Sequence, residues 1–185
     1  NNEMSMIDFE NGEIATLDIN VNFTNLIIKN GDTLRAETNN KDINCKQNNQ
    51  NLQIKEKQHN LFSKKNRGDL IVYVPENLNF KNVKISAGAG KIQVENINTE
   101  NLDLELGAGE TIINKLNVTN DCKIESGAGK VSILSGKIDD LNLDIGIGNI
   151  KIDGTKISDD SKYGNGKNII KIDGGIGNID IEFNK

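Results

Sequence analysis

The sequence predicts an all-β protein, a single-stranded β-solenoid or parallel β-helix-like stack with rungs of about 20 residues. A Gly-x-Gly doublet recurs five times between alternating apolar and polar residues, starting at Gly88, Gly107, Gly127, Gly146 and Gly175. The doublets are 19, 20, 19 and 29 residues apart, so a single insertion explains the last spacing. No segment shows the i, i+3, i+4 apolar spacing of an amphipathic helix. A short, fixed period of this kind is typical of stacked copies of one supersecondary unit.

Residues 1–80 are rich in predicted strands but lack the doublet. The alternating runs are Leu17–Val21, Leu26–Ile28, Leu34–Ala36, Ile43–Cys45, Leu52–Ile54 and Leu70–Val74. The polar stretch Lys55–Asp69 is predicted to be an exposed loop. Pro75, the only proline, closes a strand because proline cannot donate to a ladder. We expect irregular N-terminal rungs that cap the stack against end-to-end pairing, within one elongated domain that spans residues 1–185.

Beyond residue 80, each copy predicts two or three short strands separated by corners. The apolar pairs before the doublets are Val83/Ile85, Leu102/Leu104, Cys122/Ile124, Leu141/Leu143 and Ile170/Ile172. The pairs after them are Ile92/Val94, Thr111/Ile113, Val131/Ile133, Ile150/Ile152 and Ile179/Ile181. We expect successive copies to stack in parallel, about 4.8 Å apart, with glycine at the corner because it adopts backbone angles closed to other residues. The polar residues 158–168 form the predicted insertion.

Composition excludes several classes of protein. The 185 residues carry a net charge of −5 and only 4% aromatic residues, which speaks against nucleic-acid binding. No apolar run is long enough to span a membrane. The chain begins with Asn rather than Met, so we expect any leader or anchor to lie outside this sequence. Cys45 and Cys122 occupy inward positions of separate strands, and buried free thiols are the prediction, because two thiols without further ligands do not make a metal site.

One family resemblance rests on three motifs. The strand Leu70–Val74 is followed by Pro75-Glu76-Asn77, then by Val83–Gly90 with the first doublet, then by the repeated rungs. This pattern resembles the bacterial family of proposed adhesins, also called the toastrack domain, a β-strand repeat of unknown function. The resemblance covers nearly the whole chain. It implies placement at the cell envelope or surface and a role in adhesion or envelope-stress sensing, and it implies no catalytic residue.

Stacking in register would align the carboxylates of Glu105, Glu125, Asp144 and Asp173 in one column, preceded by Ser86. Such a column could bind cations or a cationic partner, since calcium takes several oxygen ligands. The alternative is a solvated face balanced by lysines. A neighbouring column, Lys84, Asp103, Lys123, Asn142 and Lys171, largely alternates in sign, which favours this alternative.

Two features of the predicted loop invite functional interpretation. Arg67-Gly68-Asp69 spells a tripeptide that some adhesion receptors recognise, but three-residue strings arise often by chance, and a turn before the next strand is the favoured interpretation. His59 is the only histidine, and no nucleophile is placed beside it by a motif. We therefore predict no catalytic, cofactor or metal residues.

The function we expect is that of a non-catalytic bacterial envelope or surface protein that binds an unknown protein or envelope component. One alternative is a structural module that self-assembles through its end rungs, as the bactofilins do. A polysaccharide-cleaving β-helix enzyme is less favoured, because such enzymes pair carboxylates with aromatic residues for sugar stacking, and Trp is absent here.

Overall fold

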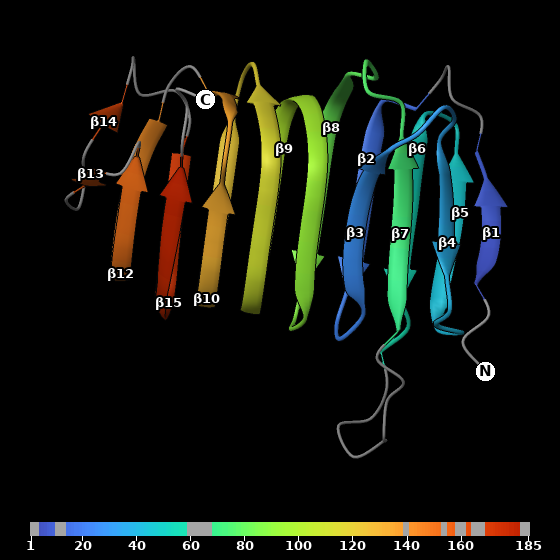
Figure 1. Cartoon of the computed structure of the whole chain (residues 1–185), viewed down its shortest axis with the longest axis horizontal. Coiled ribbons are helices and arrows are strands. Elements are labelled where there is room, and N and C mark those ends of the chain that lie inside the picture. The colour runs from blue at the N-terminus through green and yellow to red at the C-terminus, as the bar shows by residue number, and fades with distance from the viewer. Residues whose placement is uncertain are drawn as a thin grey trace.

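The computed structural model describes residues 4–9, 14–58, 68–138, 141–152, 155–157, 162–163 and 169–181, with side chains up to residue 138. The described residues form strands, turns and bends, and contain no helix. The strands stack side by side along one long axis in two layers (Figure 1). The predicted all-β, solenoid-like architecture is thereby confirmed.

In the described part of the chain, fifteen strands are hydrogen-bonded into one continuous, folded-over sheet. They are β1 (Ser5–Asp8), β2 (Thr16–Val21), β3 (Asn25–Asn30), β4 (Arg35–Thr38), β5 (Ile43–Asn48), β6 (Asn51–Glu56), β7 (Asp69–Val74), β8 (Phe80–Ala87), β9 (Lys91–Val118), β10 (Cys122–Ile133), β11 (Gly136–Ile138), β12 (Leu141–Ile152), β13 (Thr155–Ile157), β14 (Lys162–Tyr163) and β15 (Ile169–Ile181). β7 ends directly before Pro75, as predicted. The predicted insertion 158–168 contains the short strand β14, and its remaining residues lie outside the described part of the chain.

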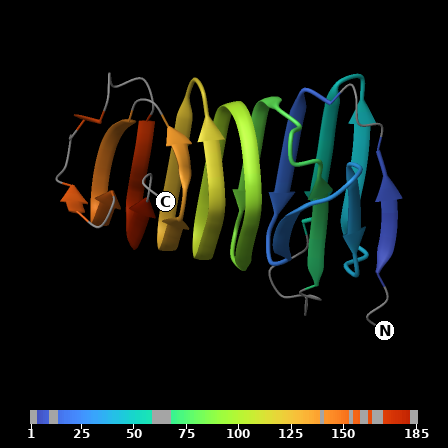
Figure 2. The same ribbon diagram turned by 45° about the horizontal axis from the view of Figure 1, so that its top comes forward.

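The two layers have different strands. One layer contains β5, β6, β2 and β8, and the other contains β1, β4, β7 and β3 (Figure 2). We call the layer of β5, β6, β2 and β8 the back layer and the layer of β1, β4, β7 and β3 the front layer. The long strand β9 belongs to both, because its residues 92–94 pair with β3 and its residues 99–106 pair with β8.

The central rungs pair in parallel and in the predicted register. Leu104 of β9 lies opposite Ile85 of β8 on one side and opposite Ile124 of β10 on the other. Gly129 pairs with Gly109 across the same interface. The glycine doublets therefore line up along one corner of the stack, as the repeat predicts.

The order of the rungs differs from the order along the chain at both ends. The rung formed by β2 and β3 lies between β6–β7 and β8–β9. At the other end, β15 lies between β10 and β12. The expectation of consecutive stacking is wrong there. Parallel rungs need only matching alternation and matching corners, and β12 and β15 share the sequence Gly-Ile-Gly-Asn-Ile-x-Ile, so either can follow β10.

The outermost strands run antiparallel to their neighbours. This holds for β1 against β4, β4 against β7, β5 against β6, and β13 and β14 against β12. The hairpin between β5 and β6 turns through Asn49 and Gln50, and Asn49 has a φ of 55°. Short connections produce antiparallel neighbours, whereas parallel pairing needs a full return of the chain.

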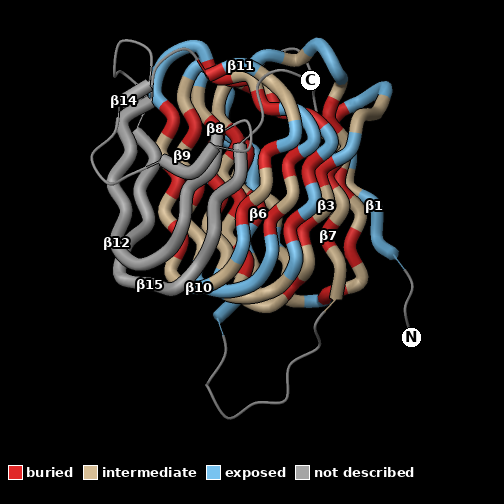
Figure 3. The backbone as a smooth tube through the Cα atoms, turned by 60° about the vertical axis from the view of Figure 1, so that its left-hand side comes forward, coloured by how far each residue is buried: buried red, intermediate tan, exposed pale blue. Residues whose placement is uncertain are grey.

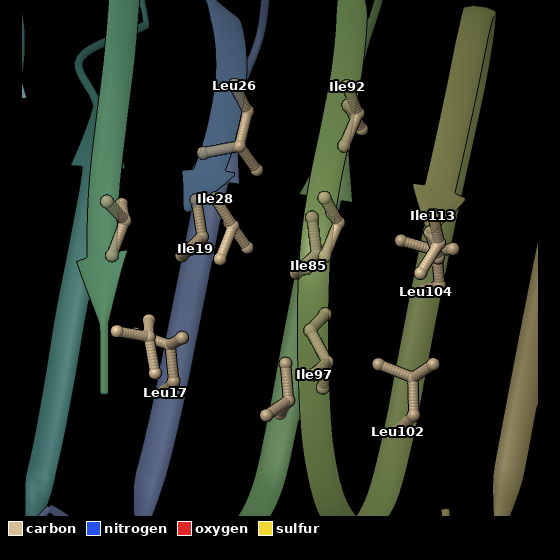
Figure 4. Close-up of a cluster of buried hydrophobic side chains, with 14 of the residues drawn as sticks. Leu17, Ile19, Leu26, Ile28, Ile85, Ile92, Ile97, Leu102, Leu104 and Ile113 are labelled. Atoms are coloured by element: carbon tan, nitrogen blue, oxygen red, sulfur yellow. The ribbon is translucent and has the colours of Figure 1, made fainter. Parts of the chain in front are cut away.

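Buried residues recur along the strands of both layers (Figure 3), and the aliphatic ones form a narrow core between the layers. Leu17, Ile19, Ile28, Ile85 and Leu104 are all at most 1% exposed and lie along this column (Figure 4). Full burial of one such side chain contributes roughly 1.5–3 kcal/mol. The alternation predicted for the described rungs therefore points the correct residues inward.

Both cysteines are free thiols, and their environments differ. Cys122 is completely buried, and burial raises its pKa to about 12. Cys45 is only partly buried, because β5 is the outermost strand of the back layer, and burial raises its pKa to about 11. The prediction of a buried thiol is confirmed for Cys122 and is only partly correct for Cys45.

The corner glycines are required by close backbone contact. Gly109 has a φ of +114°, and a Cβ atom built on it would lie 2.2 Å from the carbonyl oxygen of Gly90. Gly129 repeats the arrangement one rung later, 2.1 Å from the oxygen of Gly109. Only glycine permits both the backbone angle and the approach of the next rung.

Candidate binding surface

The outward face of the back layer carries rows of side chains that cross the rungs. One row alternates in charge from Asp18 to Lys84, Asp103 and Lys123, each residue directly opposite the next. Opposite charges on adjacent strands stabilise a sheet. This row confirms the predicted alternation as far as Lys123.

The predicted carboxylate column is present over only two rungs. Glu105 lies opposite Glu125, and the Ser86 hydroxyl donates to Oε2 of Glu105 at 3.4 Å. Asp144, however, lies opposite Lys171 and not Asp173. The four-carboxylate column is therefore wrong, because β15 enters between β10 and β12 and the pairing shifts before the doublets.

Lysines lie beside two carboxylates of this face, those of Glu125 and Asp103. Nζ of Lys123 lies 2.9 Å from Oε1 of Glu125, and this contact raises the pKa of Lys123. Burial raises the pKa of Asp103, and Glu105 raises it further, whereas Lys123 and Lys84 oppose the shift. In the described part of the chain, no three Asp, Glu, His or Cys residues are grouped so that they could hold a metal ion. These contacts favour the solvated, lysine-balanced interpretation of this face.

The carboxylates border a shallow groove that follows the glycine corner. The groove has a volume of about 380 Å³ and opens to solvent. It runs past Asn20, Ser86, Glu105 and Glu125 at right angles to the strands. The carboxylates of Glu105 and Glu125 already contact Ser86 and Lys123 on the same face. We therefore do not favour this groove as a ligand site.

A larger groove, of about 510 Å³, lies on the outward face of the front layer. We call it the front groove. It crosses β3 and two successive passes of β9, and its outward-pointing side chains are Ile27, Lys29, Gln93, Glu95, Ile112 and Asn114. Oε2 of Glu95 accepts a hydrogen bond from the backbone N–H of Asn30 at 2.8 Å, which holds this carboxylate at the rim.

The front groove has an apolar floor, although its strands should be polar on this side. Ile27 and Ile112 are partly exposed and point away from the core, whereas Ile28 and Ile113 beside them are buried. Gln93, directly opposite Ile27, supplies hydrogen-bonding groups between them. An apolar patch with a polar rim on an outer sheet face is typical of an interaction site.

Sequence reasoning missed this site, although a signal was present. Leu26-Ile27-Ile28 and Thr111-Ile112-Ile113 break strict alternation by placing isoleucine in an outward slot. Packing against the core explains only the inward residues of a half-exposed strand. The outward isoleucines are therefore a signal of a second apolar surface.

A second missed feature is a ladder of asparagines along the back corner. Nδ2 of Asn101 donates to Oδ1 of Asn82 at 3.0 Å, and Nδ2 of Asn120 donates to Oδ1 of Asn101 at 2.8 Å. Three residues earlier in each rung, Nδ2 of Asn117 donates to Oδ1 of Asn98 at 2.8 Å. The recurrence of Asn98 and Asn101 after 19 residues is visible in the sequence. These side chains satisfy one another, so their role is structural.

Of the tripeptide at residues 67–69, the structure describes Gly68 and Asp69. Arg67 and His59 lie outside the described residues. Asp69 is the first residue of β7, and its Oδ1 accepts a hydrogen bond from Nδ2 of Asn25 at 3.2 Å. Gly68 packs so closely that a Cβ atom there would lie 2.4 Å from Oδ1 of Asn39. These contacts support the interpretation of a turn that leads into a strand.

The family model for the Toastrack domain, DUF4097, matches residues 14–185. The chain belongs to the Toastrack family. A search of curated proteins found no match.

Solved bacterial structures resemble this Toastrack chain over nearly its full length. A proposed cell adhesion protein from Clostridium sporogenes is 18% identical with a TM-score of 0.65, and the alignment covers 98% of this chain and 99% of the other. A proposed adhesin from Bacteroides fragilis is 10% identical with a TM-score of 0.44, covering 97% of each chain. The first likeness supports the fold. Among the described residues of the Toastrack chain, no helix is long and apolar enough to cross a membrane.

Proposed function

We propose that this Toastrack chain is a non-catalytic module of the bacterial cell envelope or surface, and that it binds a protein partner through the front groove. The observation that carries the proposal is the pair of outward isoleucines, Ile27 and Ile112, in a groove rimmed by Lys29, Glu95 and Asn114. Protein interfaces combine an apolar centre with a polar rim in this way.

A protein fits this groove better than a glycan does. Sugar-binding surfaces use aromatic rings for stacking, and the groove has none. An aromatic residue of the adjacent strand, Tyr73 of β7, lies opposite Lys29, and its ring is already covered by the Arg35 guanidinium at 4.2 Å. Its hydroxyl donates to Oε2 of Glu37 at 3.3 Å. Tyr73 is thus engaged within the sheet.

Placement at the envelope or surface draws on the relatives. The structure from Clostridium sporogenes is described as a proposed cell adhesion protein, and we extend that role to this chain as part of the proposal. A binding role rather than catalysis is supported by the open groove, since acid–base chemistry profits from a site that excludes water.

The test measures saturable binding of the labelled chain to isolated envelopes of the bacterium that encodes it. We expect Ile112→Asn to weaken binding about 10-fold or more, because it places an amide at the apolar centre of the interface. Ile71→Asn is the matched control: Ile71 lies in the same outward row, directly opposite Ile27, but outside the groove.

Protease treatment of the envelopes should abolish binding. Binding that survives protease but not glycan hydrolysis would show a glycan partner and contradict the proposal. Equal loss of binding for Ile71→Asn and Ile112→Asn would contradict the assignment of the groove. Both variants are first shown to unfold at the wild-type temperature.

A further inference from the structure

The two layers have different lengths at the N-terminal end of the stack. In the back layer β5 lies beside β6, and in the front layer β4 lies beside β7. β6 and β7 pair with the two strands of one rung, β2 and β3, so β5 and β4 lie at the same level of the stack. β1 then adds one more strand beyond β4 in the front layer (Figure 1, Figure 2). Among the described strands, none lies beside the outer edge of β5, so the back layer is one strand shorter than the front layer.

The core is incompletely covered where the layers end. Ile7 of β1 lies opposite the buried Ala36, and Cys45 of β5 lies opposite the buried Ile54, so both side chains point inward. Both are nevertheless only partly buried, as is Ile43 on the same face of β5. One more strand beside β5 would cover these side chains.

The outer edge of β1 presents backbone groups at every second residue. The N–H of Phe9 donates to the carbonyl of Leu34 at 3.0 Å, so the backbone groups of Ile7 face β4. Those of Met6 and Asp8 face outward. This edge of β1 can bond to another strand.

The outer edge of β5 has the same alternation. The N–H of Lys57 donates to the carbonyl of Asp42 at 2.8 Å, which directs the backbone groups of Asn44 toward β6. Those of Cys45 and Gln47 therefore point to the outer edge, where they can bond to another strand.

We propose that a second copy of this chain docks on this end so that β1 of each copy lies beside β5 of the other. The two copies are related by a two-fold axis that runs parallel to the strands, between the two layers. Such an axis exchanges front and back layers and keeps strand direction and inward faces. The longer front layer of each copy then meets the shorter back layer of the other, and both sheets continue across the junction. The contact is self-complementary and closes at two copies.

Strand direction makes the new pairing parallel. β1 is antiparallel to β4, which is antiparallel to β7, so β1 runs in the direction of β7. β5 runs against β6, and β6 runs against β7 because the chain folds over between β2 and β3, with which they pair in parallel. β1 and β5 therefore point the same way (Figure 1).

The position of the two strands along the same direction sets the register. In Figure 4, Ile19 of the back layer and Ile28 of the front layer lie at the same level along the strands. Register within each layer carries these two positions to Cys45 of β5 and to Ile7 of β1. An axis parallel to the strands preserves this level, so Ile7 of one copy lies beside Cys45 of the other.

This register matches the hydrogen-bonding groups of the two edges. In a parallel pair, a residue bonds to the two neighbours of the residue that lies level with it. The N–H of Cys45 would donate to the carbonyl of Met6 of the other copy, and its carbonyl would accept from the N–H of Asp8. All of these groups point outward on their strands, whereas a shift by one residue would remove the match and place Ile7 on the wrong face.

The side chains also match. Asp8 comes level with Lys46 of the other copy on the outward face, and opposite charges on adjacent strands stabilise a sheet. Met6 comes beside the uncharged Asn44. On the inward face, the two copies of Ile7 lie across the core from each other, close to the axis. Because of the two-fold symmetry, each of the Asp8–Lys46 and Met6–Asn44 contacts forms twice.

The test is sedimentation velocity across a range of concentrations, for which we expect a reversible dimer. Asp8→Lys and Lys46→Glu should each weaken the dimer at least ~10-fold, because each places like charges opposite one another at both junctions. Lys91→Glu is the matched control, since it makes the same charge change at an exposed lysine of the central rungs. It should leave the dimer unchanged.

Mixing the two weakened variants tests the reciprocal pairing itself. An equimolar mixture of Asp8→Lys and Lys46→Glu chains should dimerise about as tightly as the wild type. The mixed dimer pairs the two introduced charges at one junction and the two original charges at the other. Because Asp8 also lies opposite Arg35 in its own sheet, both variants are first shown to unfold at the wild-type temperature. A mixture of folded variants that stays monomeric would overturn the proposal.

Amide hydrogen exchange in the wild-type chain keeps the test decisive even if a variant fails to fold. The amides of Met6, Asp8, Cys45 and Gln47 should become protected as concentration rises. A monomer at all concentrations would overturn the proposal, also if β5 then binds an unrelated extended peptide. So would a dimer in which these four amides exchange freely, or one that Lys91→Glu weakens as strongly as Lys46→Glu.

Discussion

In the central stack, formed by β8, β9 and β10, each rung pairs in parallel with the rung that follows it in the chain. At the N-terminal end, β1, β4 and β5 pair antiparallel, and the rung of β2 and β3 lies between two rungs that follow it in the sequence. The repeat is regular only where a rung has an equivalent rung on both sides. At the ends, turn length and the free edges decide the pairing.

Truncation of a core side chain should give the largest difference in unfolding free energy between the central stack and the N-terminal end. Leu104→Ala should lower the free energy of unfolding by about 2–5 kcal/mol, because Leu104 is completely buried between two rungs. Ile43→Ala on the end strand β5 should cost only about 1 kcal/mol, since Ile43 is partly buried. Urea denaturation measures both. Equal costs would show that the end is packed as tightly as the middle.

Substitution of a corner glycine should have the next largest effect. Gly109→Ala should cost about 2–4 kcal/mol, because its φ of +114° is strained for alanine and the new Cβ would meet the oxygen of Gly90. Gly88→Ala is the control. There the nearest atom is 3.1 Å away and no unusual φ is required, so we expect less than ~1 kcal/mol. Thermal unfolding distinguishes the two, and a harmless Gly109→Ala would contradict the role assigned to the corner.

The smallest expected effect concerns the charge row of the central stack. The pKa of Asp103 is raised in the folded chain, so the folded state binds this proton more tightly than the unfolded state. Its contribution to stability is therefore present below the unfolded pKa and is lost as pH rises through the folded pKa. Asp103→Asn should remove this loss and leave the chain up to ~1 kcal/mol more stable at neutral pH, because solvent screens the row.

Unfolding temperatures of Asp103→Asn and the wild type between pH 3 and pH 8 would check the sign. The unfolding temperatures of the two proteins should approach each other toward acid pH and should diverge as the pH rises. A variant that is less stable than the wild type at neutral pH would show that attraction to Lys84 and Lys123 outweighs burial at this position.

Much of the central stack could be predicted because its signals are local and repeated. The alternation of Leu102 and Leu104 identifies the buried face, and the doublet at Gly107 identifies the corner. The same logic failed for the column beyond Glu125. Asp144 and Asp173 occupy equivalent positions in the repeat, and equivalence in sequence does not establish adjacency in space.

The front groove also could not be predicted from the alternation of apolar and polar residues. Alternation assigns one face of a strand to the core and treats the other as solvated, so an outward Ile27 or Ile112 has no place in the pattern. Its meaning appears only when β3 and two passes of β9 bring the two isoleucines together.

The strands, the direction of their buried faces and the glycine corners can be predicted from the amino-acid sequence, because each follows from the chemistry of a few adjacent residues. Long-range packing sets which rungs are neighbours, where β15 and the β2–β3 rung are placed, and which surfaces assemble into grooves. Rungs with the same alternation and the same corner can pair with one another at nearly equal free energy. Their order is therefore set by chain connections and by the whole stack, and not by any one segment.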